Sequence, residues 1–382
     1  MGRKLSKYCS REGHQISGSI KKEPMDKWKQ KGIELLQQLV SIPSFSREEN
    51  QTAALIEQFL LVEGLTPQRV GNNIWCTHDS YNPKWPTVLL NSHHDTVKPV
   101  SGWESNPFDG HIKNGRITAL GSNDAGASLV ALIMTFLYFK DSPPREFNLL
   151  LAASAEEEIS GKGGVELLRD QLPPISVGIV GEPTHMQMAI AERGLIVVDA
   201  EVKGRAGHAA REVGVNAIYL ALPEIEKLKN YQFDKISSLL GPVKIAITQI
   251  QAGVQHNVVP DLCSFVLDIR TQEHYTNEEV IRELQQITQA DLRPRSLRLN
   301  ASGISEEHPL VVAGKSLRMT TFGSATLSDQ ALWPFDTIKI GCGDSARSHT
   351  AGEYIEIEEF NQGLETYIAL IKTYEKTLGK GL

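Results

Sequence analysis

Three short runs of apolar residues lack the polar alternation of a half-exposed strand. They read VLLNS at 88–92, NLLLAAS at 148–154 and VGIVGE at 177–182. Strands that are apolar throughout are covered on both faces, which is typical of a parallel sheet between layers of helices. Helical patterns at 127–139 and 163–172 separate these runs. The pattern therefore predicts an α/β fold whose mostly parallel sheet carries helices on both faces.

The middle of the chain has a different pattern of predicted strands and helices. A strand at 195–204 and a helix at 215–229 are followed by two strand-like runs, VKIAITQIQAG and VVPDLCSFVLDIR. A helix at 277–289 and a strand at SLRLNASG complete the series. This β-α-β-β-α-β order is that of the split ferredoxin-like motif. We expect residues 195–302 to form an inserted α+β domain, with residues 25–194 and 303–382 building the other domain together.

Composition narrows the class of function. A chain of 382 residues that is 41% hydrophobic can bury the cores of two domains. Its net charge of -7 argues against nucleic acid and anionic membranes as partners. The four cysteines form no CxxC pair, which favours a reducing, cytoplasmic location. Residues 1–24 are polar and basic, and we expect a disordered leader there.

Histidines and carboxylates follow the apolar runs. Asn91, His93 and Asp95 share one side of the first strand if alternation holds, whereas Ser92 and His94 share the other. A carboxylate beside an imidazole is a common device for orienting a metal ligand. A structural reading is a pair of strand-end histidines capped by a turn aspartate.

Further acidic residues come at comparable places. Asp124 precedes an apolar helix, where a helix cap is the structural reading. Glu156, Glu157 and Glu158 follow the second run, Glu182 ends the third, and His349 comes after a later strand. Several unpaired carboxylates at one edge of a sheet would repel each other unless cations gather them. The set therefore indicates a metal site.

Five ordered motifs carry a family resemblance: SHHDTV, SNDAG, AEEE, GEPT and SHTAGEY. They resemble the M20-type di-metal aminoacylase/carboxypeptidase family, which includes succinyl-diaminopimelate desuccinylase and carboxypeptidase G. TLSDQAL (326–332) and GDSARSHTAGEY make the chain most similar to acetylornithine deacetylase-like members. The resemblance runs from about Trp28 to the C-terminus.

This resemblance implies a role for each residue. His93 and Glu182 are expected on one divalent ion, Glu158 and His349 on the other, and Asp124 between both. Glu157 is expected to be the general acid/base, with Glu156 as the less favoured candidate, and Asp95 to orient His93. Ligands that are all nitrogen and oxygen suit zinc first, or cobalt and manganese.

The resemblance also makes residues 195–302 a lid and dimerisation domain. His208 of GRAGHAAR is then expected to reach the active site of the other subunit and stabilise the oxyanion, which requires a homodimer. Asn257 and Arg270 are expected to hold the α-carboxylate of a small-molecule substrate. For Arg270 the alternative is a structural ion pair.

Our first functional hypothesis is removal of an N-acyl group from an amino acid, with N-acetylornithine hydrolysed to ornithine and acetate in arginine biosynthesis. The alternatives are N-acetyl- or N-succinyl-citrulline, then succinyl-diaminopimelate or a dipeptide. A hypothesis from another class is a serine hydrolase that uses Ser345 with His349 as base. The last is a non-catalytic member of the family.

Overall fold

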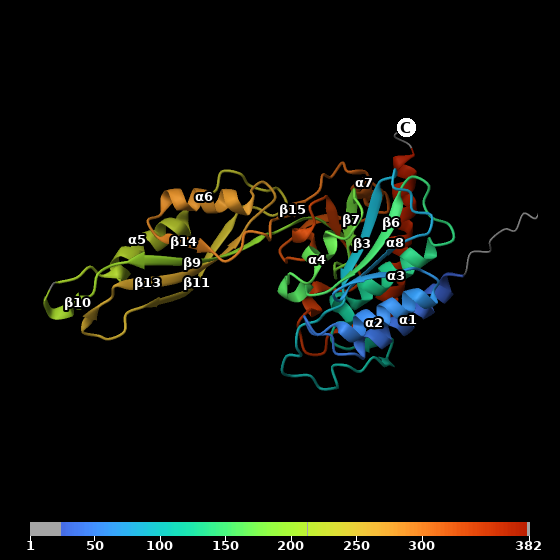
Figure 1. Cartoon of the computed structure of the whole chain (residues 1–382), viewed down its shortest axis with the longest axis horizontal. Coiled ribbons are helices and arrows are strands. Elements are labelled where there is room, and N and C mark those ends of the chain that lie inside the picture. Colours follow the sequence, from blue (N-terminus) through green and yellow to red (C-terminus); the bar gives the residue numbers. More distant parts are fainter. Residues whose placement is uncertain (1–23, 212, 380–382) are drawn as a thin grey trace, which may run out of the picture.

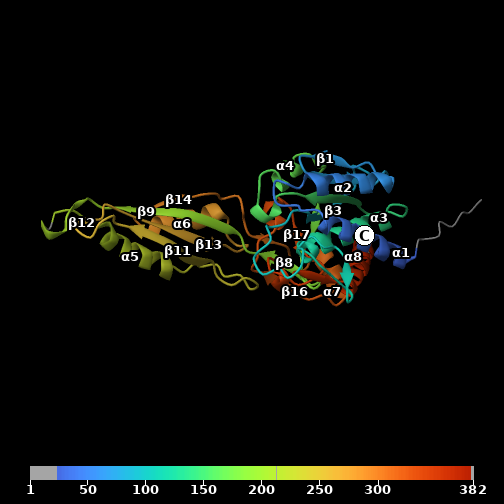
Figure 2. The same ribbon diagram turned by 90° about the horizontal axis from the view of Figure 1, so that it is seen from below.

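The computed structural model describes residues 24–211 and 213–379 and has two bodies side by side (Figure 1). The leader expected at 1–24 lies outside the described residues except for Pro24. Over the described residues, no helix is both long and apolar enough to cross a membrane. The larger body holds both ends of the described chain, and the smaller one is built from its middle (Figures 1 and 2).

The larger body is organised on a mixed sheet with the order β1-β2-β6-β3-β7-β17-β8-β15, and β16 also pairs with β8. Its strands are β1 (Gln68–Val70), β2 (Asn73–Thr77), β3 (Thr87–His93), β6 (Asn148–Ser154), β7 (Val177–Val180), β8 (Met188–Glu192), β15 (Ser302–Gly303), β16 (Thr321–Ser324) and β17 (Thr337–Lys339). A small sheet of β4 (Ile112–Lys113), β5 (Arg116–Thr118) and β18 (Tyr354–Glu356) lies beside it.

The sheet is parallel at its centre and mixed toward its edges. β6, β3, β7 and β17 run parallel to their neighbours in that group, β2 and β8 pair antiparallel at its two sides, and β16 pairs parallel with β8. The expected α/β fold is therefore confirmed, with a mixed sheet whose central strands are parallel. At one edge the physical reason is connection length, because the two residues between β1 and β2 form a tight turn that cannot return the chain parallel.

Helices cover both faces of this sheet. The larger core packs β3 and β6 against α1 (Met25–Val40), α2 (Asn50–Val62), α3 (Ala127–Tyr138), α7 (Pro309–Ser316) and α8 (Ile357–Leu378). A smaller cluster on the other face includes α4 (Val165–Arg169) and the short turn η4 (Asp329–Leu332). Alternate residues of β6 serve each side, with Leu151 in the first core and Leu150 in the second. Burial on both faces explains why the strands are apolar throughout.

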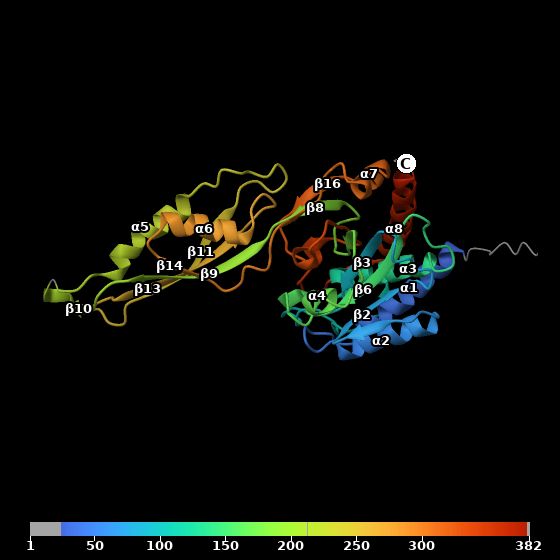
Figure 3. The same ribbon diagram turned by 45° about the horizontal axis from the view of Figure 1, so that its top comes forward.

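The smaller body is a four-stranded antiparallel sheet with the order β11-β13-β9-β14. It consists of β9 (Leu195–Lys203), α5 (Ala217–Asn230), β11 (Lys244–Ala252), β13 (Leu262–Arg270), α6 (Asn277–Ile287) and β14 (Asp291–Pro294). Both helices lie on one face of the sheet (Figure 3). The ribbon of β10 (Gly207–His208) and β12 (Val258–Val259) projects at the end farthest from the larger body (Figure 1).

The expected last strand of this domain is misplaced in the sequence reading. SLRLNASG was expected to form it, but the strand that pairs with β9 is β14, which ends before that segment begins. Residues 296–301 instead return toward the larger body, where β15 pairs with β8. Leu297 and Leu299 alternate with polar residues, whereas β14 has only Leu292 before Pro294. The sequence pattern therefore favoured the later segment, and pairing with β9 decides for the earlier one.

Candidate metal centre

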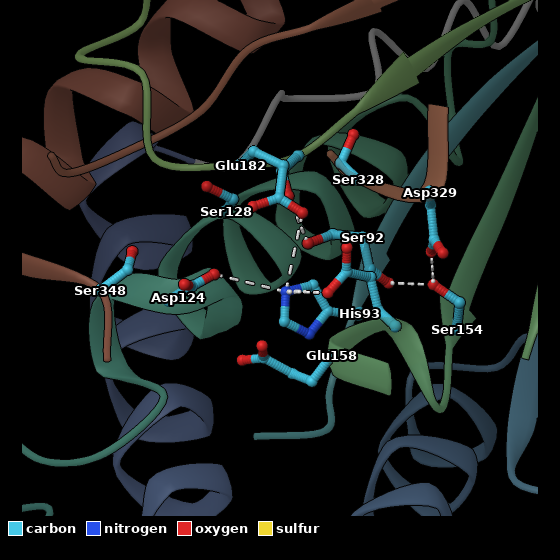
Figure 4. Close-up of polar contacts among 12 residues, drawn as sticks. Ser92, His93, Asp124, Ser128, Ser154, Glu158, Glu182, Ser328, Asp329 and Ser348 are labelled. Carbon is cyan, nitrogen blue, oxygen red and sulfur yellow. Dashed lines mark hydrogen bonds and ion pairs between the residues drawn. The ribbon is translucent and has the colours of Figure 1, made fainter. Parts of the chain in front are cut away.

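The carboxyl ends of three adjacent parallel strands meet at one edge of the larger sheet. His93 is the last residue of β3, Glu157 and Glu158 follow β6, and Glu182 comes two residues after β7. Asp124 lies in the turn Ser122–Gly126 that leads into α3. Figure 4 shows the side chains of Asp124, Glu158 and Glu182 around His93. Strand ends of this kind are the usual ligand-binding edge of an open α/β sheet.

His93 stands at the centre with one nitrogen satisfied and one not. Its Nδ1 donates to the backbone carbonyl of Asp95 at 3.0 Å, so in the neutral ring Nε2 carries the lone pair. Nε2 is buried without a hydrogen-bond partner and lies 3.5 Å from Asp124 Oδ1 and 3.7 Å from Glu182 Oε1. Donors bound to one zinc ion are about 3 to 3.5 Å apart. The site therefore fits a divalent cation.

Asp95 organises the ligands on two neighbouring strand ends. Its carboxylate lies 3.4 Å from His93 Nδ1 and accepts the backbone N–H groups of Glu157 and Glu158 at 3.0 and 3.2 Å. Ser46 donates a further hydrogen bond of 2.7 Å to the same carboxylate. One buried carboxylate thus joins the histidine to the turn that follows β6.

The three consecutive glutamates point in different directions. Glu156 has a left-handed backbone with φ of 54°, and its carboxylate accepts the backbone N–H of Gly163. Glu157 Oε2 lies 3.9 Å from His93 Nε2, and Glu158 Oε2 accepts a hydrogen bond from His349 Nε2 at 2.9 Å. Glu156 therefore faces away from the centre, and the other two face it.

Asp124 is held in place by its backbone N–H, so its carboxylate can face the two histidines. No side chain caps α3, so the helix-cap reading of Asp124 is wrong. Instead, the buried carboxylate of Glu353 accepts the backbone N–H groups of Asn123 and Asp124, each at 2.9 Å. Asp124 Oδ1 faces His93 and its Oδ2 lies 3.6 Å from His349 Nε2. A carboxylate between two histidines has the geometry that a bridging ligand needs.

Two overlapping groups of side chains could each hold an ion. His93, Asp124 and Glu158 form one, and His93, Glu157 and Glu182 form the other, with the ligand atoms of each group within 4.8 Å of one another. Glu157 thus lies as close to His93 as the expected ligands do. Its assignment as acid/base rather than ligand stays a prediction.

Crowding of acidic groups changes the protonation of the cluster. Burial, and then nearby charges that include Asp124, raise the pKa of Glu182 to about 8. Burial also raises the pKa of Glu157 well above its usual value. The hydrogen bond that His349 donates to Glu158 raises the pKa of His349 to about 9. Burial opposes the charged form of His93, yet Glu157 and Asp124 raise its pKa well above the ordinary value. Protons thus occupy several positions that cations can take.

A cavity of about 430 Å³ opens beside the cluster. Asp124, Glu157, Glu158, Glu182 and His349 line one side of it. The opposite wall comes from the loop after β16, with Thr326 and Leu327, and from Lys339. Lys339 is buried and its Nζ lies 2.6 Å from Glu192 Oε2, so its charge is already paired.

The structure does not bring the expected lid residues to this cavity within one chain. His208 is exposed in β10, and the Asn257 carbonyl accepts the N–H of Ala209 in the same ribbon, far from the cluster (Figure 1). Arg270 ends β13, and its guanidinium donates two hydrogen bonds to Asp268 at 2.7 and 3.1 Å. The structural reading of Arg270 as an ion-pair partner therefore holds in this chain.

His94 is a structural histidine. Its Nε2 donates to the carbonyl of Asn72 at 2.9 Å, and its Nδ1 lies 2.9 Å from Thr52 Oγ1. Burial lowers its pKa, which keeps the ring neutral. Alternation along the strand had placed it on the side away from His93, and the structure agrees.

Sequence reasoning missed four buried charged residues around the centre: Asp329, Glu353, Lys339 and Glu192. Burial and nearby charges raise the pKa of Asp329 to about 7 and that of Glu353 to about 8. Asp329 and Glu353 both lie in motifs that carry the family resemblance, TLSDQAL and SHTAGEY. Their place in these motifs was the only sequence signal for Asp329 and Glu353, because their hydrogen-bond partners are far away in the sequence.

Comparison with known proteins identifies the fold. Residues 190–296 match the model of the peptidase dimerisation domain of the M20 type. Aminopeptidase PepT from Bacillus cereus superposes with a TM-score of 0.72 at 19% identity, over 91% of this chain and 98% of its own. A dinuclear metal-binding peptidase of the M20 family from Bacillus subtilis, YXEP, also gives 0.72, at 15% identity over 92% and 99% of the two chains. The chain has the M20 peptidase fold.

Curated relatives extend over the whole M20 fold. The succinyl-diaminopimelate desuccinylase of Thioalkalivibrio sulfidiphilus is 24% identical over 371 residues, which cover 89% of this chain and 98% of the relative. That of Cereibacter sphaeroides is 27% identical over 274 residues, with 66% and 71% covered. The alternative that names an N-succinyl substrate is therefore better supported than N-acetylornithine.

Proposed function

We propose that this protein is a metal-dependent amidohydrolase that removes an N-acyl group from an amino acid. One observation carries the proposal: the buried Nε2 of His93, without a hydrogen-bond partner, faces the carboxylates of Asp124 and Glu182 at 3.5 and 3.7 Å. An unprotonated imidazole nitrogen among carboxylates in a buried site is the donor set of a divalent cation.

The proposed arrangement uses two ions. His93 and Glu182 would hold one, Glu158 and His349 the other, and Asp124 would lie between them. Zinc is the first choice because all ligands are nitrogen and oxygen, and cobalt or manganese would fit the same donors. When bound, such a pair acidifies a water molecule and polarises the scissile carbonyl.

Glu157 is the proposed general acid/base. Its carboxyl group lines the cavity beside His93, and burial raises its pKa well above the usual value, which makes it a stronger base than an exposed carboxylate. In the proposed reaction Glu157 takes the proton of the attacking water and delivers it to the nitrogen of the leaving amine. Proton transfer by a positioned side chain contributes about 10² to 10⁴ in rate.

An N-succinyl amino acid is the proposed substrate class, ahead of N-acetylornithine. Support comes from the desuccinylases that resemble this chain over most of its length. A cavity of about 430 Å³ has room for a substrate of that size. Within this chain no unpaired cation among the described residues lines the cavity wall opposite the cluster, so a partner must supply any further positive charge.

A homodimer through the inserted domain meets that need. We propose that residues 25–194 and 303–382 form the catalytic domain and that 195–302 form the lid and dimerisation domain. The match of residues 190–296 to a peptidase dimerisation domain supports this division. In such a dimer the exposed His208 and Asn257 would serve the partner's cavity, and Arg270 would exchange Asp268 for the substrate carboxylate.

A substrate panel with metal-depleted and reloaded protein tests the proposal. N-succinyl and N-acetyl forms of ornithine, citrulline and diaminopimelate, with a dipeptide as competitor, are incubated with protein treated with a chelator and then with zinc, cobalt or manganese. We expect loss of hydrolysis with the chelator, recovery with metal, and the highest kcat/KM on an N-succinyl amino acid. Hydrolysis that survives metal removal refutes the proposal.

The same panel addresses a serine hydrolase. The hydroxyl of Ser345 is exposed, and His349 Nε2 is already bonded to Glu158. We therefore expect a serine-acylating reagent to leave activity unchanged, and the Ser345→Ala variant to match the wild type. Inactivation by the reagent that is lost in Ser345→Ala favours the serine mechanism instead.

A further inference from the structure

Three consecutive polar side chains are buried directly after Thr326 and Leu327, which line the cavity. Ser328, Asp329 and Gln330 are 2%, 2% and 1% exposed, although they follow a loop and begin a short helical turn. Each is bonded to a different part of the sheet: Ser328 to Glu192 of β8, Asp329 to Ser154 of β6, and Gln330 to Thr337 of β17. Burying polar groups costs free energy unless they are paired, and Gln330 Oε1 is left without a hydrogen-bond partner.

Asp329 ends a chain of hydrogen bonds whose direction is fixed as far as Ser154. Trp333 Nε1 donates to Asn91 Oδ1 at 3.0 Å, and an indole nitrogen can only donate. The amide nitrogen of Asn91 therefore faces Ser154 and donates to its Oγ at 2.9 Å. The Ser154 hydroxyl then donates to Asp329 Oδ2 at 2.5 Å (Figure 4). In this chain of bonds Asp329 is the acceptor.

This chain of bonds lies under the residues proposed for catalysis. Ser154 is the last residue of β6, three positions before Glu157, and it pairs in register with His93 of β3. Asn91 lies on β3 two positions before His93, and its amide also donates to the Ala152 carbonyl. The bonded side chains thus join the two strand ends from which His93 and Glu157 extend into the cavity.

We propose that Asp329 is a positioning residue that fixes the relative placement of His93 and Glu157 through Ser154. The inference rests on the proposed hydrolytic function. Asp329 touches neither substrate nor ion in this role. It supplies the one acceptor that keeps the Ser154 hydroxyl directed across the sheet.

Loss of Asp329 has a defined structural consequence. The backbone carbonyl of Ser92 lies 3.2 Å from Ser154 Oγ, so it is the competing acceptor for the same hydroxyl hydrogen. Without Asp329 the hydroxyl turns to Ser92, and the direct hydrogen bond between the end of β6 and the turn Asp329–Leu332 is lost. A misplacement of about 1 Å between reacting groups can cost about 100-fold in rate.

Four variants separate positioning from general destabilisation. Asp329→Asn keeps an oxygen acceptor of the same size, Asp329→Ala removes it, and Ser154→Ala removes the donor. Gln330→Ala is the matched control, because Gln330 is equally buried in the same turn but bonds Thr337, away from His93 and Glu157. Each protein is measured at a temperature where it is fully folded, as cobalt(II)-loaded dimer, with the best substrate of the panel.

We expect Asp329→Ala to lower kcat about 100-fold with KM changed less than about threefold, since positioning acts on the transition state. Its cobalt d–d absorption spectrum should differ from that of the wild type. Asp329→Asn should restore the spectrum and most of kcat, Ser154→Ala should resemble Asp329→Ala, and Gln330→Ala should lose thermal stability without losing kcat.

Three results overturn the inference. An Asp329→Ala variant with wild-type kcat and spectrum shows that Asp329 positions nothing. An Asn variant as impaired as the Ala variant shows that hydrogen-bond acceptance is not its role. A Gln330→Ala variant with the same loss of kcat shows that the effect belongs to any damage to the turn. A wild type that neither binds metal nor hydrolyses the panel overturns the proposed function and this inference with it, whereas the three results above leave the proposed function intact.

Discussion

Metal binding should release protons from this site, and the number of protons can be worked out from its charges. Ligands must be deprotonated when a cation binds. In the metal-free protein at pH 7, a group with a pKa of about 8, such as Glu182, is mostly protonated. His349 has a pKa of about 9 and is protonated as well, and the raised pKa of His93 favours its protonated form.

The sign and size of the pH dependence follow. Glu182 and His349 have pKa values above 7, so each holds a proton that the cation must displace, and the raised pKa of His93 acts in the same direction. Glu182 and the half-exposed His349 should contribute about one proton each, and His93 up to one more. Between pH 6 and 7 the overall affinity for the ion pair should therefore rise about 100- to 1,000-fold. The dependence should weaken above pH 8 as Glu182 ionises, and again above pH 9.

Isothermal titration calorimetry of metal-depleted protein in buffers of different ionisation enthalpy counts these protons directly. We expect about two to three protons released for two zinc ions at pH 7. His349→Asn should reduce the count. His308→Asn is the matched control, because His308 caps α7 away from the cluster and asparagine is a good cap. Ligands with ordinary pKa values would release only about half a proton at pH 7. A count near that value would refute the reasoning.

Three further predictions concern single residues. Glu157→Gln should keep zinc content, measured by elemental analysis, yet lower kcat by about 10² to 10⁴, and a turnover near wild type would remove Glu157 from the reaction. Lys339→Met should lower the free energy of unfolding by about 3 to 5 kcal/mol in urea melts, because it leaves the buried Glu192 unpaired. The double variant with Glu192→Gln should recover much of that loss, and no recovery would contradict the assigned pair. Arg270→Ala should raise KM at least about tenfold with little change in melting temperature, since an ion pair as accessible as that with Asp268 contributes about 0 to 1 kcal/mol. An unchanged KM would leave Arg270 with the structural role alone.

Much of this site could be predicted because its chemistry is local in the sequence. His93, Glu157, Glu158 and Glu182 each directly follow or end an apolar run, and parallel strands bring their carboxyl ends to one edge. Alternation along β3 also separated His93 from His94 correctly. Such periodicities survive in any fold that buries those strands.

Choices among neighbouring residues depended on backbone conformation. Glu156 was separated from Glu157 only by its left-handed backbone, which turns its carboxylate toward Gly163. The last strand of the inserted domain was decided by pairing with β9, although the apolar alternation is clearer in the segment that follows β14. Neither outcome follows from residue type, because each depends on what the segment meets in space.

The sequence by itself determined which apolar runs form the central strands and which residue types gather at the sheet edge. It also determined the two-domain organisation, from the change in the pattern of apolar and polar residues. Only the tertiary structure revealed what holds those residues in place. Asp329 meets Ser154 across 175 positions, and Glu353 meets Asn123 across 230. Such partners have no local pattern, because a buried hydrogen bond is specified by where two distant segments pack and not by the residues that flank either one.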